Sequence, residues 1–161
     1  MRELNEGDAM PAFDLPTDGC GSVSIASMQG KPYVLYLYPK DDNPGCTKEA
    51  IGFTEKKAEF AAAGVPIIGL SKDDVASHDK FKKKHDLDLV LAADTEGELV
   101  EALGAWVEKS MYGKTYMGID RSTFLVGADG RIVRAWRKVK VPGHVEEVLA
   151  AATAHASGKA A

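Results

Sequence analysis

The sequence predicts an α/β fold in which a central mixed sheet is flanked by helices. The first reason is a β-α-β unit that opens with the apolar run at residues 34–38. The second is a β-hairpin over residues 122–137. The third is a terminal helix that begins near His144.

The β-α-β unit is the clearest part of the pattern. Residues 34–38 form a continuous apolar run that Pro39 ends, as expected of a central strand covered on both faces. After a loop at 39–45, the apolar spacing over 47–62 predicts a helix that Gly64 ends. The next strand follows at 65–70, so the two strands should run parallel.

The remaining elements complete one core. An early strand is expected at 22–25, and further elements follow in order: a helix at 74–85, a strand at 89–91, a short helix at 98–103, a long loop at 104–120 and the hairpin strands at 122–126 and 131–137. This order is that of a thioredoxin-like core. We expect residues 1–161 to form a single domain, with a core at about 8–150 and a frayed, Ala-rich C-terminal tail.

Composition and charge exclude several classes of protein. The chain has 161 residues, of which 45% are hydrophobic and 27% are charged, so it is neither disordered nor collagen-like. Its net charge of −4 and pI near 5.6 argue against nucleic acid as a partner. Because no signal segment and no apolar run of about 18 residues is present, we expect a cytoplasmic protein with no membrane partner.

Two cysteines, Cys20 and Cys46, are too few for a disulfide scaffold or a four-ligand zinc site. Two thiols in a chain that can build its own core indicate a reducing compartment. His78 and His85 could share a helix face, but a metal site would need more ligands nearby, so we expect both at the surface.

Cys46 stands where a buried strand, a Pro-rich loop and the start of a helix meet. Helix N-termini carry unsatisfied N–H groups and a partial positive charge, so a thiolate there is stabilised and its pKa falls. The alternative is a small buried cysteine with no chemical role. The spacing alone leaves both readings open.

The segment around Cys46 resembles the active-site loop of peroxiredoxins, whose pattern is Pro, three residues, Thr or Ser, two residues, Cys. With Pro39, Pro44-Gly45-Cys46-Thr47 and Glu49, it is similar to the bacterioferritin-comigratory-protein (peroxiredoxin Q) subfamily. Two other blocks resemble the same subfamily, and the resemblance extends over about residues 8–150. The first block is Asp14-Leu15-Pro16. The second comprises Trp106, Glu108-Lys109, Tyr112-Gly113-Lys114, Tyr116-Met117-Gly118-Ile119 and Arg121-Ser122-Thr123-Phe124.

The resemblance implies a thiol-dependent peroxidase that acts on hydrogen peroxide and organic hydroperoxides through a cysteine sulfenic acid. Cys46 would attack the peroxide, and Arg121 would stabilise the thiolate and the developing oxygen charge. Glu49 would orient Arg121, and Pro39 would shield the thiolate. Backbone N–H groups at the helix start, including that of Cys46, would bind peroxide oxygen. No metal or organic cofactor is implied.

Asn43 stands where the family has Thr or Ser. A hydroxyl donates and accepts through one atom, whereas an amide does so through two separate atoms with a different reach. We therefore expect weaker peroxide activation or a rearranged loop.

The usual resolving cysteine is also missing. Ile51 stands five residues after Cys46, where many members of the subfamily carry it, and no cysteine follows Cys46 at all. We favour a one-cysteine mechanism in which an external thiol of thioredoxin, glutaredoxin or glutathione reduces the sulfenic acid. Cys20 is then a turn residue, and the rival is a Cys20–Cys46 disulfide.

Other function classes stay in view. A disulfide reductase would need Cys-x-x-Cys, but Glu49 occupies the second position. A redox sensor or holdase on a peroxidase scaffold is the alternative that Asn43 keeps open. Since the subfamily is often monomeric, a monomer is expected.

Overall fold

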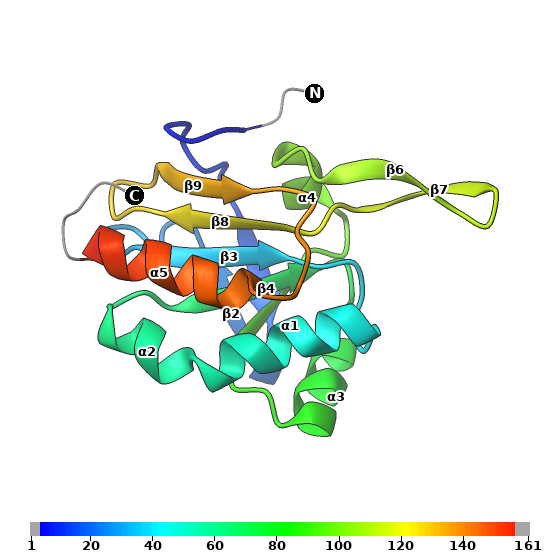
Figure 1. Cartoon of the computed structure of the whole chain (residues 1–161), viewed down its shortest axis with the longest axis horizontal. Coiled ribbons are helices and arrows are strands. Elements are labelled where there is room, and N and C mark those ends of the chain that lie inside the picture. The colour runs from blue at the N-terminus through cyan, green and yellow to red at the C-terminus, as the bar shows by residue number, and fades with distance from the viewer. Residues whose placement is uncertain (1–3, 157–161) are drawn as a thin grey trace.

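A seven-stranded mixed sheet forms the centre of the molecule, in the order β2-β1-β5-β4-β3-β8-β9, and a separate two-stranded sheet pairs β6 with β7 (Figure 1). This computed structural model describes residues 4–156. The strands are β1 (Asp14–Thr17), β2 (Gly21–Ser24), β3 (Tyr33–Leu37), β4 (Ile67–Ser71), β5 (Val90–Ala93), β6 (Trp106–Met111), β7 (Lys114–Ile119), β8 (Ser122–Val126) and β9 (Ile132–Trp136).

Helices cover both faces of the sheet (Figure 1). They are η1 (Asp18–Cys20), a short 3₁₀ turn, and the α-helices α1 (Pro44–Glu55), α2 (Lys57–Ala62), α3 (Val75–His85), α4 (Glu98–Ala102) and α5 (His144–Ala156). One apolar cluster joins α1, α2, α3 and α5 to the sheet, and a second joins α4 to the opposite face. The predicted mixed sheet flanked by helices is thereby confirmed.

The β-α-β unit forms as expected, because β3 pairs with β4 in parallel. Side chains of β3 alternate between the two cores: Val34 and Tyr36 face α1, whereas Leu35 and Leu37 face the α4 side. All five residues of β3 are buried. A strand covered on both faces explains why the sequence shows an unbroken apolar run rather than an alternation.

The helix predicted at 47–62 differs in two respects. It begins earlier, at Pro44, because Asn43 caps it and proline suits the first helical position. It is also interrupted at Lys56, whose φ of −97° and ψ of 2° separate α1 from α2. The earlier start places Cys46 in the first turn of α1.

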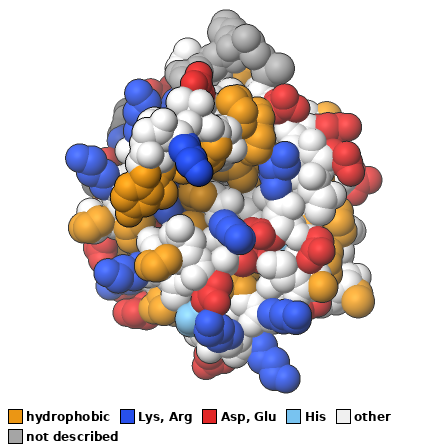
Figure 2. Space-filling view, turned by 90° about the vertical axis from the view of Figure 1, so that its right-hand side faces the viewer, with side chains coloured by type: hydrophobic (Ala, Val, Ile, Leu, Met, Phe, Trp, Pro, Cys, Tyr) orange, Lys and Arg blue, Asp and Glu red, His pale blue; other side chains and the backbone are white. Residues whose placement is uncertain are grey.

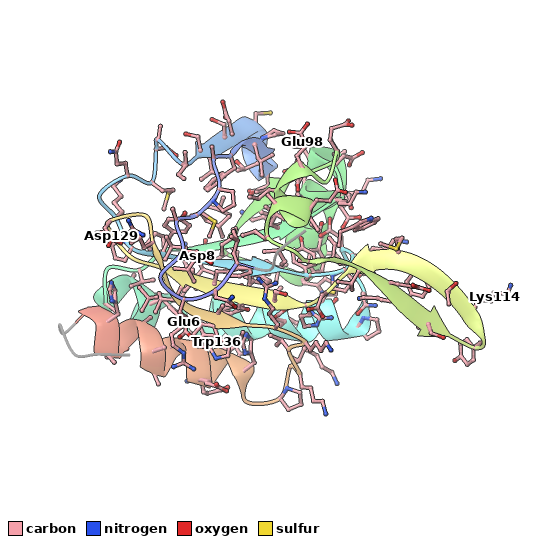
Figure 3. All side chains as sticks on the ribbon, turned by 90° about the horizontal axis from the view of Figure 1, so that it is seen from above. Glu6, Asp8, Glu98, Lys114, Asp129 and Trp136 are labelled. Atoms are coloured by element: carbon pink, nitrogen blue, oxygen red, sulfur yellow. The ribbon has the colours of Figure 1, made fainter. Side chains whose placement is uncertain are left out.

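The prediction of a loop at 104–120 is wrong, since β6 and β7 form an antiparallel hairpin there. Tyr112 and Gly113 both adopt positive φ, of 53° and 77°, which is the backbone that a two-residue hairpin turn requires. The hairpin extends beyond the body of the protein, with Lys114 at its far end (Figures 1 and 3). Apolar side chains gather at this end of the molecule (Figure 2), and Tyr112 is 96% exposed. Neither strand has one consistently buried face, so the sequence shows no hydrophobic alternation there.

Helix α5 is the last element of the described residues. Helix α5 includes the start of the Ala-rich segment, while residues 157–161, where fraying is predicted, lie outside the described residues. Within the described part of the chain, no helix is long and apolar enough to cross a membrane.

Candidate active site

Helix α1 begins at the cysteine loop because of a local cap. The side-chain oxygen of Asn43 accepts hydrogen bonds from the backbone N–H groups of Gly45, at 3.0 Å, and Cys46, at 3.3 Å. These groups would otherwise be unsatisfied at the helix start. The N–H of Cys46 is also one of the groups that the family resemblance assigns to peroxide oxygen, and in this structure it donates to Asn43 instead.

Cys46 lies beneath the surface and faces a cation. Cys46 is only 1% exposed, and Nη2 of Arg121 lies 3.3 Å from its Sγ. Arg121 comes from the connection between β7 and β8, 75 residues along the chain. Gly45 permits this approach, because a Cβ at that position would lie 3.2 Å from Nη2 of Arg121. The fold therefore brings together a thiol and a guanidinium that are remote in sequence.

Glu49 holds the other side of the guanidinium. Its Oε1 accepts from Nη1 of Arg121 at 2.7 Å, and its side chain is fully buried. Its second oxygen, Oε2, has no hydrogen-bond partner among the described residues. Cys46 and Glu49 lie one helical turn apart in α1, which directs both side chains at the same arginine. The three predicted residues Cys46, Glu49 and Arg121 thus form one cluster.

Burial and charge oppose each other in this cluster. Burial raises the pKa of the Cys46 thiol, while the Arg121 guanidinium lowers it, and the balance lies above the ordinary value. This is the reverse of the direction expected from the helix start alone. Burial likewise raises the pKa of Glu49 to about 7, against the lowering effect of Arg121. Two potential anions therefore lie on either side of the Arg121 guanidinium in a desolvated site.

Pro39 precedes a residue whose backbone contacts Cys46. It follows the end of β3 and is partly exposed, and the next residue, Lys40, directs a backbone hydrogen bond to Cys46 that favours the thiolate. Sequence reasoning missed the Lys40 N–H. A backbone donor leaves no trace in residue type, so no signal could have revealed it.

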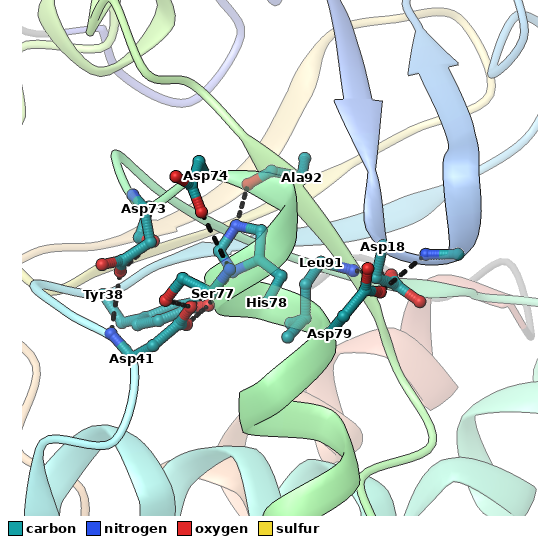
Figure 4. A network of polar contacts seen from close by, with 12 residues as sticks. Asp18, Tyr38, Asp41, Asp73, Asp74, Ser77, His78, Asp79, Leu91 and Ala92 are labelled. Atoms are coloured by element: carbon teal, nitrogen blue, oxygen red, sulfur yellow. Dashed lines mark hydrogen bonds and ion pairs between the residues drawn. The ribbon is translucent and has the colours of Figure 1, made fainter.

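A buried polar network beside the site was also missed. The prediction that His78 lies at the surface is wrong, because its exposed fraction is 0% and it contacts Asp41 of the cysteine loop (Figure 4). The signal was present in the sequence, since Phe81 lies three residues later on the same helix face and is buried. His85 is partly exposed and pairs with Asp42 at 2.7 Å.

Cys20 lies in a different environment from Cys46. It is exposed, belongs to η1 and has a left-handed backbone with φ of 61°. Gly19 beside it donates from its backbone N–H to Asp79 of α3 at 2.9 Å. Both thiols are free in this structure.

The described residues contain no group of three or more His, Cys, Asp or Glu side chains that could hold a metal ion. A thioredoxin-like core with a buried cysteine in the first helical turn, paired to an arginine from a distant strand connection, defines a thiol peroxidase of the peroxiredoxin class. Residues 7–135 match the AhpC/TSA family. The chain belongs to this family, as one of its Bcp/PrxQ peroxiredoxins.

Relatives and solved structures agree with this assignment. Peroxiredoxin Bcp of Bacillus subtilis is 46% identical over 143 residues, which are 89% of this chain and 91% of the relative. Peroxiredoxin Q of Xanthomonas campestris has a TM-score of 0.85 and 44% identity, covering 89% of this chain and 91% of its own. PrxQ of Xylella fastidiosa has a TM-score of 0.91 and 38% identity, covering 97% and 99%. The protein is therefore a thiol-dependent peroxidase.

Proposed function

We propose that Cys46 is the nucleophile of this peroxidase and that it turns over by a one-cysteine mechanism. The observation that supports this role is the 3.3 Å contact between the buried Sγ of Cys46 and Nη2 of Arg121. A fixed positive charge beside sulfur favours the thiolate and also stabilises the oxygen charge that develops when the peroxide bond breaks.

The proposed reaction oxidises sulfur by two electrons. The Cys46 thiolate attacks one peroxide oxygen, so an S–O bond forms as the O–O bond breaks. The other oxygen leaves with the bonding pair and takes a proton, which gives water or an alcohol. An external thiol then attacks the sulfenic sulfur and water leaves, and a second thiol releases reduced Cys46 as a disulfide of the reductant forms.

The neighbours of Cys46 have separate proposed roles. Arg121 stabilises charge at the sulfur and the peroxide, and Glu49 orients Arg121 through the 2.7 Å contact. Asn43 fixes the first turn of α1, and its amide is the group available where the family carries a hydroxyl. Pro39 stops the strand pairing and restricts the backbone conformation where the loop begins, next to Lys40.

The one-cysteine mechanism rests on the contrast between the two thiols. Cys46 is buried and Cys20 is exposed on a turn that is anchored to α3. Position 51, on the same helix as Cys46, carries isoleucine. We propose that thioredoxin, glutaredoxin or glutathione supplies the reducing thiol. The monomeric state, the cytoplasmic location and the single-domain organisation over residues 1–161 stay predictions.

Mass spectrometry after one equivalent of hydrogen peroxide tests the mechanism. We expect a sulfenic or sulfinic acid on Cys46 with Cys20 still reduced, and unchanged peroxide turnover in Cys20→Ser. A peptide bridged between Cys20 and Cys46 would contradict the one-cysteine mechanism. Full activity in Cys46→Ser would contradict the assignment of the nucleophile.

A redox sensor or holdase is the second candidate, because the Asn43 oxygen already occupies the N–H groups of Gly45 and Cys46. A peroxide consumption assay separates the two functions. Catalytic turnover with a reducing thiol supports the peroxidase, whereas oxidation of Cys46 without turnover supports the sensor.

A further inference from the structure

A buried polar network attaches the cysteine loop to helix α3 (Figure 4). Oδ2 of Asp41, in the loop, lies 2.8 Å from Nδ1 of His78 in α3. The side chains of His78 and Asp41 are only 0% and 4% exposed. Asp41 also accepts hydrogen bonds from the Tyr38 hydroxyl at 2.6 Å and the Ser77 hydroxyl at 2.7 Å. One carboxylate in the loop is thus the acceptor for three side chains.

The partners of His78 define its protonation. Nε2 lies 2.9 Å from the backbone oxygen of Ala92, which can only accept, so Nε2 carries a proton. Nδ1 faces the Asp41 carboxylate, which already receives two hydroxyl donors, so Nδ1 carries a proton as well. With a proton on each nitrogen, the ring is a buried imidazolium paired with a buried carboxylate.

The charged surroundings agree with this state. Burial lowers the pKa of His78. The hydrogen bond and charge of Asp41, the carbonyl of Ala92 and the charge of Asp73 raise this pKa, and together they outweigh burial, so the pKa lies above its ordinary value. The titratable groups that face the ring are Asp41 from the loop, Asp73 from the connection before α3 and Tyr38 next to β3.

The network continues from Asp41 towards the thiol. The backbone N–H of Asp41 donates to Asp73 at 2.8 Å. The next residue, Asp42, has a left-handed φ of 64° and its side chain contacts Lys84 and His85 of α3. Asn43 follows directly and caps the N–H of Cys46. Every loop residue from Asp41 to Asn43 is therefore fixed by a side-chain contact.

We propose that His78 is a positioning residue for the peroxide reaction: held between Asp41 and Ala92, it clamps the cysteine loop onto α3 in the geometry that Cys46 needs. The inference rests on the proposed role of Cys46 as nucleophile. The clamp favours oxidation, which needs Cys46 held against Arg121, and opposes reduction by a bulky thiol, which needs Sγ to be exposed.

Packing alone does not account for this arrangement. A buried ion pair contributes little net stability compared with apolar side chains of similar volume, so the fold itself does not require one here. What the pair supplies is direction, because charge-assisted hydrogen bonds fix a loop that has few apolar side chains of its own. A small displacement of a reacting group is enough to slow catalysis strongly.

Two substitutions of similar size test the clamp. The amide nitrogen of asparagine can occupy the place of Nδ1, and that of glutamine the place of Nε2. His78→Asn therefore keeps the contact with Asp41, whereas His78→Gln keeps only the contact with Ala92. Both are made in a Cys20→Ser background so that one thiol reacts, with His155→Gln in α5 as the matched control.

We expect His78→Gln to slow the reaction of reduced Cys46 with hydrogen peroxide by about tenfold to a hundredfold, with His78→Asn losing much less and His155→Gln nothing. Reduction of the sulfenic acid by thionitrobenzoate, a bulky aromatic thiol, should be faster in His78→Gln than in the parent. Rates are compared below the onset of unfolding. Equal losses in the two His78 variants, or none, would overturn the proposal, whereas an inactive parent would refute the peroxidase assignment of Cys46 instead.

A second route does not depend on the folding of His78→Gln. Ser77→Ala removes one hydroxyl from Asp41 and leaves the histidine in place, so it should slow peroxide reaction in the same direction to a smaller extent. Nitrogen NMR of the parent should show both ring nitrogens of His78 protonated at neutral pH. A Ser77→Ala variant with the parent's rate, or a bare ring nitrogen on His78, would overturn the clamp.

Discussion

The side-chain oxygen of Asn43 accepts a hydrogen bond from the backbone N–H of Cys46 at 3.3 Å, so one amide both caps a helix and borders the thiol. Asn43→Ala removes the cap and should lower the free energy of unfolding by about 1 kcal/mol, measured by urea denaturation. Asn43→Thr should keep most of that stability, because threonine also caps helices.

The rate with hydrogen peroxide separates the two roles of Asn43. In Asn43→Thr the hydroxyl can accept from the helix start and still donate to the thiolate or peroxide. We expect its second-order rate constant to exceed that of the parent. If the rate stays the same or falls, then the amide does not limit peroxide activation.

Arg121 supplies the positive charge that contacts Cys46 directly. Arg121→Gln should raise the pKa of Cys46 further, because it removes the group that opposes burial. It should also slow the peroxide reaction by about 10²- to 10³-fold, the usual effect of losing a donor to a developing oxyanion. The pH dependence of Cys46 alkylation in Cys20→Ser measures the first effect. Arg131→Gln at the surface is the matched control, and a parental alkylation profile in Arg121→Gln would contradict the prediction.

Glu49 links stability to pH. Burial raises the pKa of its carboxyl to about 7, from an ordinary 4.5, so the folded protein holds this proton more tightly than the unfolded chain. The contribution of Glu49 to stability is therefore greatest below pH 4.5 and declines as the pH rises to 7. The stability of the parent minus that of Glu49→Gln should fall over this interval in urea titrations. A flat difference would show that Glu49 stays ionised throughout.

His144 has the opposite slope. It is buried at the start of α5 with Nε2 2.8 Å from the Thr123 hydroxyl, and burial lowers its pKa to about 4. Its contribution to stability is complete above pH 6.5 and is lost as the pH falls towards 4, since only the unfolded chain takes up the proton there. His144→Gln should remove this loss. Unfolding midpoints measured at pH 4.5 and 7 check it, with His155→Gln as the control.

Most of the helices and strands along the chain could be predicted because local patterns encode them, but the strand β1 (Asp14–Thr17) and the order of the strands across the sheet could not. The buried run of β3 and the Gly64 stop after α2 required no knowledge of distant contacts. The β6–β7 hairpin could not be predicted in the same way, because its strands do not have one buried face. Tyr116 and Met117 are neighbours in sequence and are 45% and 50% exposed, so hydrophobic alternation is absent.

In the candidate site, too, some residues could be predicted from the sequence and others could not. Cys46, Glu49 and Arg121 were predicted through motif resemblance, and the structure brings them into contact. The link between His78 and Asp41 joins residues 37 positions apart, and neither residue type nor spacing reveals such a pairing. The direction of the Cys46 pKa was also unpredictable from the helix start, because it depends on how deeply the fold buries the sulfur.

Because Cys46 is only 1% exposed, the size of a reagent should determine how easily it reaches the sulfur. Hydrogen peroxide has only two heavy atoms and needs a much smaller opening to reach this sulfur than a protein thiol does. We therefore expect reduction by a protein thiol to require a larger movement of the first turn of α1 than oxidation does. Under a burst of peroxide, the slower admission of the reductant would determine how long the enzyme remains in its oxidised form.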